Sequence, residues 1–179
     1  MILVTGGAGF IGSHIVEHFQ GQAEVVVLDN FRSGHRRNLT GLEHRLIEGS
    51  ILDRAKLDKA LRGVDQVYHL AAMISVPESM LKPRECVELN VTGTLQLLEA
   101  AAAAKVGKVV LASSAAIYGD NPTVPKVETM LPEPKSPYAV TKLDGEFYLE
   151  LFRREHGLAT ASLRFFNVFG PRQIGRAHV

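Results

Sequence analysis

The chain begins MILVTGGAGFIGSH (residues 1–14), in which a short apolar run is followed by four glycines and then by more apolar residues. The run Ile2–Thr5 is typical of a buried strand, and the apolar side chains within residues 11–19 recur at the four-residue spacing of a helix. A flexible linker does not have such apolar flanks. We therefore interpret the glycines as a turn in which the backbone must approach a bulky, charged group.

Three of these glycines, Gly6, Gly9 and Gly12, stand three residues apart between the strand and the helix. In a dinucleotide-binding turn the first glycine permits the tight turn, the second lets the backbone approach a pyrophosphate, and the third lets the helix pack closely on the sheet. The N–H groups at the start of the helix, around Phe10 and Ile11, would bind the phosphates. The sequence therefore predicts a dinucleotide site at this turn.

A carboxylate follows the second predicted strand, which spans residues 25–28. Asp29 stands where a carboxylate accepts hydrogen bonds from the adenosine ribose, and we expect Asn30 to line the same site. A 2′-phosphate about 4 Å from that carboxylate would be disfavoured by on the order of 4 kcal/mol at an effective dielectric constant of about 20. We therefore expect NAD rather than NADP, unless nearby arginines fold over the ribose. The candidate arginines are Arg32, Arg36 and Arg37.

Short β-rich runs alternate with longer helical patterns, which predicts βαβ units and a parallel sheet. The strand candidates are Ile2–Thr5, Val25–Leu28, Arg45–Glu48, Gln66–Leu70, Val109–Ala112 and Ala161–Arg164. Helical spacing is found within residues 11–19, 53–61, 87–102 and 140–151, and the last of these helices is expected to begin at Ser136-Pro137 and to end before Gly157. We expect an α/β fold of the Rossmann type, a doubly wound parallel sheet with helices on both faces, forming one domain over residues 1–173. Residues 121–137 are expected to form an ordered active-site loop.

The composition excludes several classes of protein. The 179 residues are 46% hydrophobic and 22% charged with a net charge of +1, so no basic field predicts a nucleic-acid partner. No apolar run reaches the roughly 20 residues of a membrane span, and no basic segment marks a signal peptide. The single cysteine, Cys86, fits a cytoplasmic location and is expected to be buried. His14 and His18 share a helix face but lack a third ligand, so we expect no metal site.

A tyrosine and a lysine stand four residues apart in the last predicted helix. Tyr138 and Lys142 therefore share one helix face. A tyrosine that acts as a base near neutral pH needs its pKa lowered by about three units, and one nearby cation supplies about one to three. We expect Tyr138 to become a competent base chiefly when a positively charged nicotinamide ring is bound beside it.

Five motifs stand in an order and spacing that resemble those of the extended short-chain dehydrogenase/reductase family. The motifs are TGGAGFIGSH (5–14), VYHLAA (67–72), ASSAAIYGD (112–120), SPYAVTK (136–142) and LRFFNVFGPRQ (163–173). Within that family the chain is most similar to the NAD-dependent 4-epimerases of UDP-glucose and UDP-N-acetylglucosamine. The resemblance implies a nucleotide-sugar substrate and epimerisation at the sugar C4.

The resemblance assigns catalytic roles to Ser114, Tyr138 and Lys142. Tyr138 would deprotonate the sugar 4-hydroxyl while a hydride passes from C4 to NAD, and Ser114 would hydrogen-bond the same oxygen and relay the proton. Lys142 would hold the nicotinamide ribose and lower the pKa of Tyr138. The 4-keto sugar would then turn over in the site, so that the hydride returns to the opposite face.

The same resemblance implies further site residues. The additional cofactor contacts would be Ser50, Ile51, Leu70, Ala71, Ala72 and Phe165. Relatives usually have an aspartate in place of Ser50, which implies that the contact to the adenine amino group is weaker here. Asn167 would reach the substrate diphosphate, and Ser75 is expected to contact the substrate as well.

Three other functions are compatible with a fold of this kind: a 4,6-dehydratase, a decarboxylase and a non-catalytic sensor. A nucleotide-sugar 4,6-dehydratase needs an acid and a base beside the serine, but the chain has Ala115 and Ala116 there. A UDP-glucuronate decarboxylase stays open. A non-catalytic NAD-binding sensor would have no physical need to keep Ser114, Tyr138 and Lys142 together.

Two expectations concern the extent and assembly of the protein. Residues 174–179 (IGRAHV) match the translation of a sequencing adapter, so we expect a non-native scar there and a substrate domain that is largely missing. Such a truncated chain would bind NAD but turn over little sugar nucleotide. Relatives generally dimerise through the helices equivalent to residues 84–104 and 138–155, so a homodimer is expected for the full-length protein.

Overall fold

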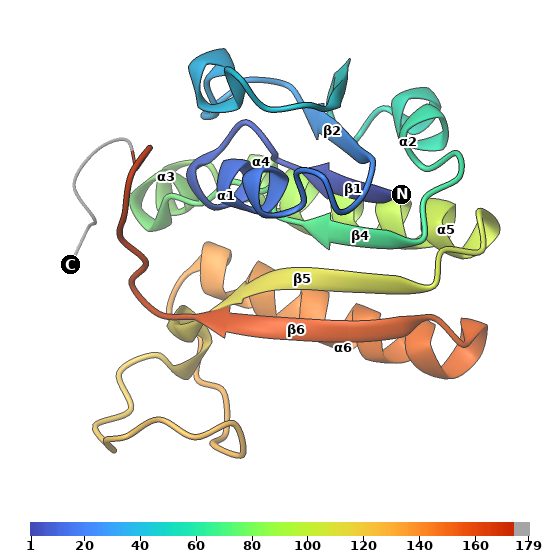
Figure 1. Ribbon diagram of the computed structural model, residues 1–179. Helices are drawn as coiled ribbons and strands as arrows, with labels where there is room; N and C mark the ends of the chain where they lie inside the picture. The colour runs from blue at the N-terminus through green and yellow to red at the C-terminus, as the bar shows by residue number, and fades with distance from the viewer. Residues whose placement is uncertain (174–179) are drawn as a thin grey trace.

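A computed structural model describes residues 1–173, in which one parallel sheet carries all the strands (Figure 1). The strands are β1 (Ile2–Thr5), β2 (Val25–Asp29), β3 (Arg45–Glu48), β4 (Gln66–His69), β5 (Lys108–Ser114) and β6 (Ala159–Phe165). They lie in the order β3-β2-β1-β4-β5-β6, and every neighbouring pair is parallel. The chain thus winds from β1 to one edge of the sheet and from β4 to the other, which confirms the predicted doubly wound fold.

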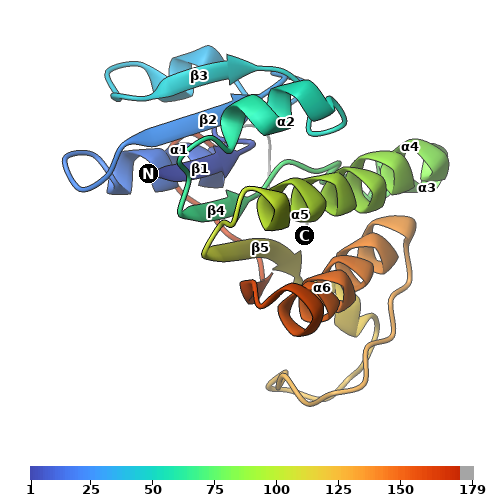
Figure 2. The same cartoon turned by 90° about the vertical axis from the view of Figure 1, so that its right-hand side faces the viewer.

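Helices cover both faces of this sheet, but unequally. They are α1 (Phe10–His18), α2 (Arg54–Ala60), α3 (Val76–Leu81), α4 (Pro83–Val87), α5 (Gly93–Ala103) and α6 (Pro137–His156). Shorter turns are η1 (Arg36–Leu39), the π turn η2 (Glu88–Thr92) and η3 (Ala115–Tyr118). Figure 2 shows α2, α5 and α6 on one face and α1 on the other. Leu3 packs in the cluster of the first face, whereas Ile2 and Val4 pack in that of the second, because strand side chains alternate.

The helix predicted within residues 87–102 is longer and less regular than expected, since α4, η2 and α5 follow one another without a break from Pro83 to Ala103. Asn90 lies in the π turn. Its side chain accepts a hydrogen bond from the backbone N of Met73 (2.7 Å) and donates to the carbonyl of Met73 (3.1 Å) and to Oγ1 of Thr141 (3.0 Å). Asn90 therefore joins the segment after β4 to α6, a structural role.

Helix α3 was not predicted, although it carries a local signal. The hydroxyl of Ser75 accepts a hydrogen bond from the N of Glu78 (3.2 Å), and Pro77 occupies the first turn. Ser75-x-x-Glu78 is the sequence pattern of a capping box. Ser79 of this helix accepts a hydrogen bond at Oγ from the backbone N of Tyr138 (3.2 Å), so α3 helps to place α6.

Helix α6 begins and ends at the residues that the sequence indicates. The hydroxyl of Ser136 accepts a hydrogen bond from the N of Ala139 (3.1 Å), and Pro137 takes the first helical position. Gly157, with φ of +66°, ends the helix in the left-handed conformation. These two caps fix the turn that carries Tyr138.

After β6 the chain crosses the carboxyl ends of the strands and reaches α1 (Figure 1). There the guanidinium of Arg172 donates to Nδ1 of His14 (2.6 Å) and pairs with Glu17, while Nε2 of His14 donates to the carbonyl of Pro171 (2.9 Å). The expected scar, residues 174–179, lies outside the described residues. Within residues 1–173, no helix has the length and apolar character needed to cross a membrane.

Candidate dinucleotide and active site

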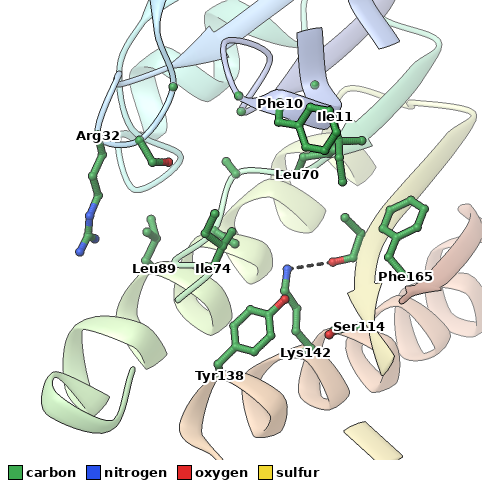
Figure 3. A pocket seen from close by; sticks show the side chains of 18 of the residues that line it. Phe10, Ile11, Arg32, Leu70, Ile74, Leu89, Ser114, Tyr138, Lys142 and Phe165 are labelled. Atoms are coloured by element: carbon green, nitrogen blue, oxygen red, sulfur yellow. Dashed lines mark hydrogen bonds between the residues drawn. The ribbon is translucent and has the colours of Figure 1, made fainter. Parts of the chain in front are cut away.

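A cavity of about 620 Å³ lies at the carboxyl ends of the strands. The ends of β1, β2, β4, β5 and β6 and the first turns of α1 and α6 line it (Figure 3). The cavity borders β1 and β4, between which the winding of the sheet reverses direction. Open α/β sheets bind their ligands at this position.

The glycine turn forms one wall of the cavity. Gly6 has φ of +71°, and a Cβ there would lie 2.8 Å from the backbone N of Ala71. A Cβ on Gly12 would lie 2.2 Å from the carbonyl oxygen of Gly6, so both positions require glycine. Helix α1 begins at Phe10 without a side-chain cap, which leaves its first N–H groups available to an anionic ligand.

Asp29 is buried at the end of β2 and lines the same cavity. Its Oδ2 accepts a hydrogen bond from the N of Ala8 (2.9 Å), and its Oδ1 accepts one from the N of Phe31 (2.7 Å). These bonds fix the carboxylate against the glycine turn. A carboxylate has about four acceptor positions, so Asp29 keeps the capacity to accept hydrogen bonds from ribose hydroxyls.

Ser114, Tyr138 and Lys142 meet at the other end of the cavity (Figure 3). Ser114 ends β5, where its hydroxyl accepts a hydrogen bond from the N of Ala116 (3.1 Å). Nζ of Lys142 lies 5.7 Å from the centre of the Tyr138 ring and donates to the carbonyl of Ala112 (2.8 Å). The structure therefore brings together the three side chains to which the sequence assigned the chemistry.

The two titratable groups of this trio are tuned by burial. Burial lowers the pKa of Lys142 from 10.5 to about 8. It also raises the pKa of Tyr138, an effect that the Ser114 hydroxyl partly opposes. The direction for Tyr138 is opposite to the lowering by Lys142 that we expected, because burial outweighs the neighbouring groups. A further positive charge is therefore needed before Tyr138 can act as a base near neutral pH.

His69, the last residue of β4, is buried beside the site and is neutral. Burial, and secondarily the charge of Lys142, lowers the pKa of His69 from 6.5 to about 3. Its Nδ1 lies 2.7 Å from Oγ1 of Thr5, and its Nε2 lies 3.0 Å from Oγ1 of Thr94. Because the Thr94 hydroxyl donates to the carbonyl of Asn90 (2.6 Å), it accepts from His69, which places the imidazole proton on Nε2. His69 thus bonds two hydroxyls rather than the local backbone.

All the site residues named from the sequence line this cavity except Ser75. Those that do are Gly6, Gly9, Phe10, Ile11, Gly12, Asp29, Asn30, Ser50, Ile51, Leu70, Ala71, Ala72, Ser114, Tyr138, Lys142, Phe165 and Asn167. Ser75 is not among the lining residues, and its hydroxyl caps α3 instead. Its two neighbours, Ile74 and Val76, line the cavity instead.

Sequence reasoning missed other lining residues. They include Ser33, Gly34, Ala112, Ser113, Val168 and Gln173. A signal existed for Gly34, a glycine soon after Asp29: a Cβ there would lie 2.8 Å from the carbonyl carbon of Ala8. Val168 and Gln173 stand within the motif LRFFNVFGPRQ, but the return of the chain to α1 is what brings them to the site. Among residues 1–173, no group of three or more His, Cys, Asp and Glu side chains is arranged to hold a metal ion.

The chain belongs to the NAD dependent epimerase/dehydratase family, whose sequence pattern matches residues 2–179. It is 40% identical over 179 residues to a UDP-glucose 4-epimerase from Azospirillum brasilense, covering 98% of this chain and 51% of that one. The described fold and the glycine turn agree with this membership, which confirms the resemblance found from the sequence motifs.

Two solved structures are close in both sequence and fold. A UDP-N-acetylglucosamine 4-epimerase from Methanobrevibacter ruminantium, in complex with UDP-N-acetylmuramic acid, is 42% identical with a TM-score of 0.93, over 97% of this chain and 56% of that one. A UDP-glucose 4-epimerase from Thermus thermophilus in complex with NAD is 43% identical with a TM-score of 0.92, over 99% and 58%. The chain thus spans a little over half the length of these relatives.

Proposed function

We propose that the full-length protein is an NAD-dependent 4-epimerase of nucleotide sugars. The observation that carries the proposal is one cavity with two specialised ends: the glycine turn and Asp29 at one, and Ser114, Tyr138 and Lys142 at the other. A dinucleotide has the same division, since its adenosine and phosphates are recognised and its nicotinamide reacts.

The residues of this chain would share the work as follows. The N–H groups at the start of α1 bind the pyrophosphate, and Asp29 accepts hydrogen bonds from the adenosine ribose. Tyr138, ionised as phenolate, takes the proton of the sugar 4-hydroxyl and later returns it, while Ser114 holds the same oxygen. Lys142 donates to the nicotinamide ribose and stabilises the phenolate. The bound NAD supplies a hydride acceptor that gives the hydride back within the same turnover.

The residues beside Ser114 favour epimerisation over elimination of water. Ala115 and Ala116 line the cavity directly after Ser114. Neither alanine can act as the acid or the base that a 4,6-dehydratase requires. A UDP-glucuronate decarboxylase is the remaining enzymatic alternative. A non-catalytic sensor is disfavoured, because Ser114, Tyr138 and Lys142 meet in the cavity and burial lowers the pKa of Lys142 to about 8, which binding alone does not require.

The substrate that fits this proposal is a UDP-linked hexose or its N-acetylated equivalent. Asn167 and Phe166 line the cavity next to Phe165, in the position where a sugar diphosphate would follow the nicotinamide. Under this proposal the Ser75 hydroxyl contacts the substrate only if its hydrogen bond with the backbone N of Glu78, which caps α3, is broken. We assign no preference between the two kinds of sugar.

Assembly and location complete the proposal. Exposed apolar side chains gather on α4 and α6, namely Val87, Val140, Phe147 and Leu151. An apolar face of this kind fits a homodimer built from these helices. The single cysteine, Cys86, is buried and free, as in proteins of the reducing cytoplasm, where we place the enzyme.

The deciding experiment uses the full-length gene. We expect the purified product to interconvert UDP-glucose with UDP-galactose, or the N-acetylated pair, without added reductant, and both pairs are assayed side by side. The variant Tyr138→Phe should lose at least about a hundredfold in rate, since it removes the proton acceptor, and should still bind NAD. An unchanged rate in Tyr138→Phe would refute the assignment of the base.

The 179-residue chain alone should behave differently. Because the relatives that it matches are nearly twice as long, we propose that it binds NAD but has little or no epimerase turnover. Calorimetric titration with NAD and an epimerase assay on the same preparation test both parts. Measurable turnover by this chain would contradict the second part and leave the first intact.

A further inference from the structure

Arg32 lies close to the expected ribose site but is directed away from it. It stands three residues after Asp29, and both residues line the cavity. Figure 3 shows its side chain extending away from Phe10 and Ile11. There Nη2 of Arg32 lies 2.7 Å from Oε1 of Glu78 in α3 and 2.8 Å from Oε1 of Glu85 in α4.

The two glutamates are themselves held in place. Nζ of Lys82, in the turn between α3 and α4, lies 3.9 Å from Oε1 of Glu78 and 3.4 Å from Oε2 of Glu85. The four side chains form a network of two positive and two negative charges. The two glutamates therefore balance the charge of Arg32 on the side of the cavity formed by α3.

A guanidinium near this carboxylate has one evident chemical use. Arginine binds phosphate through a planar pair of donors, and an arginine beside the ribose is what accommodates a 2′-phosphate in proteins that take NADP. A second candidate, Arg36, is also engaged elsewhere: it pairs with Glu48 and lies over the Phe31 ring (4.3 Å from its centre).

We propose that Glu78 and Glu85 are specificity-determining positioning residues that exclude NADP by holding Arg32 away from the ribose. This inference rests on the proposed use of a dinucleotide and adds the reason why only one of the two dinucleotides is taken. With Arg32 occupied, the repulsion between Asp29 and a 2′-phosphate is not offset. The discrimination therefore depends on α3 and α4 as well as on the end of β2.

The ion pairs that hold Arg32 are partly exposed, so their effect on affinity is small enough to be measured as a change in the dissociation constant. The side chains of Arg32, Glu78 and Glu85 are 33%, 37% and 42% exposed. An ion pair with this exposure changes an equilibrium constant by up to about fivefold. Removing both carboxylate charges should therefore free Arg32 and raise the affinity for NADP on the order of tenfold.

The test measures the affinity of the 179-residue chain for NAD and for NADP by calorimetry. We expect the double variant Glu78→Gln, Glu85→Gln to bind NADP about tenfold more tightly than the wild type and to bind NAD unchanged within about twofold. Glutamine keeps the length of the side chain, so thermal unfolding should stay close to that of the wild type. The matched control is Glu150→Gln, which removes a carboxylate that also pairs with two arginines, Arg153 and Arg154, on α6.

Two further variants separate release of Arg32 from a general change in charge. Adding Arg32→Ala to the double variant should abolish the gain in NADP affinity, and Arg32→Ala alone should leave NADP affinity as it is in the wild type. A gain that survives Arg32→Ala, an unchanged NADP affinity in the double variant, or a loss in Arg32→Ala alone would each overturn the inference. If the wild type binds neither dinucleotide, the proposal that this chain binds NAD fails together with the inference, whereas NAD binding with an unchanged ratio of the two affinities refutes the inference alone.

Discussion

The buried side chain of Lys142 carries a cost in stability. Lys142 is 6% exposed, and its ammonium group donates a hydrogen bond to the carbonyl of Ala112. The same burial that lowers its pKa to about 8 makes its charge unfavourable in the folded chain. A bound ribose would supply further acceptors, so a ligand would relieve part of this cost.

The pH dependence of stability reports this directly. Because the folded pKa of Lys142 is about 8 and its ordinary value is 10.5, the unfolded chain holds more protons between these values, and stability rises with pH. We expect the free energy of unfolding to increase by about 2 kcal/mol from pH 8 to pH 10 through this residue. Urea unfolding across that range should show the rise in the wild type and not in Lys142→Met. The control Lys59→Met changes an exposed lysine, and equal slopes in all three proteins would contradict the assignment.

Burial also governs the charge of His69, but there it lowers the pKa on the acid side of neutrality. Its pKa of about 3 keeps the imidazole neutral, so its Nε2–H can serve Thr94 and its Nδ1 can accept from Thr5. These bonds join the ends of β1 and β4 to α5. Since the winding of the sheet reverses between β1 and β4, a neutral imidazole there steadies both walls of the cavity.

At the scale of elements, an ion pair joins α6 to the edge strand β6. Nη2 of Arg164 lies 2.8 Å from Oε2 of Glu146, and Glu146 also accepts from the Ser113 hydroxyl of β5. Nη1 of Arg164 donates to Tyr118 Oη (3.0 Å) and to the carbonyl of Glu128 (3.1 Å). The pair therefore connects the loop of residues 121–136 to the helix that carries Tyr138.

Glu146→Gln should be among the more destabilising single changes in α6. Removing the carboxylate charge leaves the largely buried guanidinium of Arg164 facing neutral acceptors in place of an opposite charge, at a cost of about 3 kcal/mol. Urea unfolding at pH 7 measures the difference. The control Glu150→Gln, on an exposed turn of the same helix, should change stability little. If the two variants lose the same stability, the Glu146 pair is not holding the elements together.

At the scale of the whole molecule, local signals predicted most of the fold. The strands, the glycine turn and the limits of α6 follow from apolar periodicity and from Ser136, Pro137 and Gly157, which act within a few residues. Helix α3 was missed because its capping pattern is followed by only one turn and a half of helix. The π turn was missed because the apolar residues of this segment keep a helical spacing in the sequence, so nothing marks the turn within the helix.

The parts of the site that escaped prediction depend on contacts between distant segments. Arg32 and Glu78 are 46 residues apart, and Arg172 and His14 are 158 apart. No local pattern can pair such residues, since the fold alone brings them together. The pKa of Tyr138 also depends on the fold. The sequence shows that Lys142 stands four residues after Tyr138, but it does not show the burial that raises the pKa.

The exposed apolar face of α4 and α6 yields the last prediction. Phe147 and Leu151 stand one turn apart on α6 and are 60% and 51% exposed, an arrangement that a second copy of the chain could cover. We expect the 179-residue chain to be a dimer in sedimentation experiments at tens of micromolar, because the helices that form this face are present in it. The double variant Phe147→Glu, Leu151→Glu should be a monomer with unchanged affinity for NAD, since neither residue lines the cavity.

Phe169 provides the matched control for this experiment. It is 86% exposed but lies after β6, away from α4 and α6, so Phe169→Glu removes an equally large exposed aromatic side chain without touching the proposed interface. If Phe169→Glu dissociates the dimer as completely as the double variant does, general surface hydrophobicity rather than this helical face drives association. A wild-type chain that stays monomeric at these concentrations would place the contacts needed for a dimer outside the two helices.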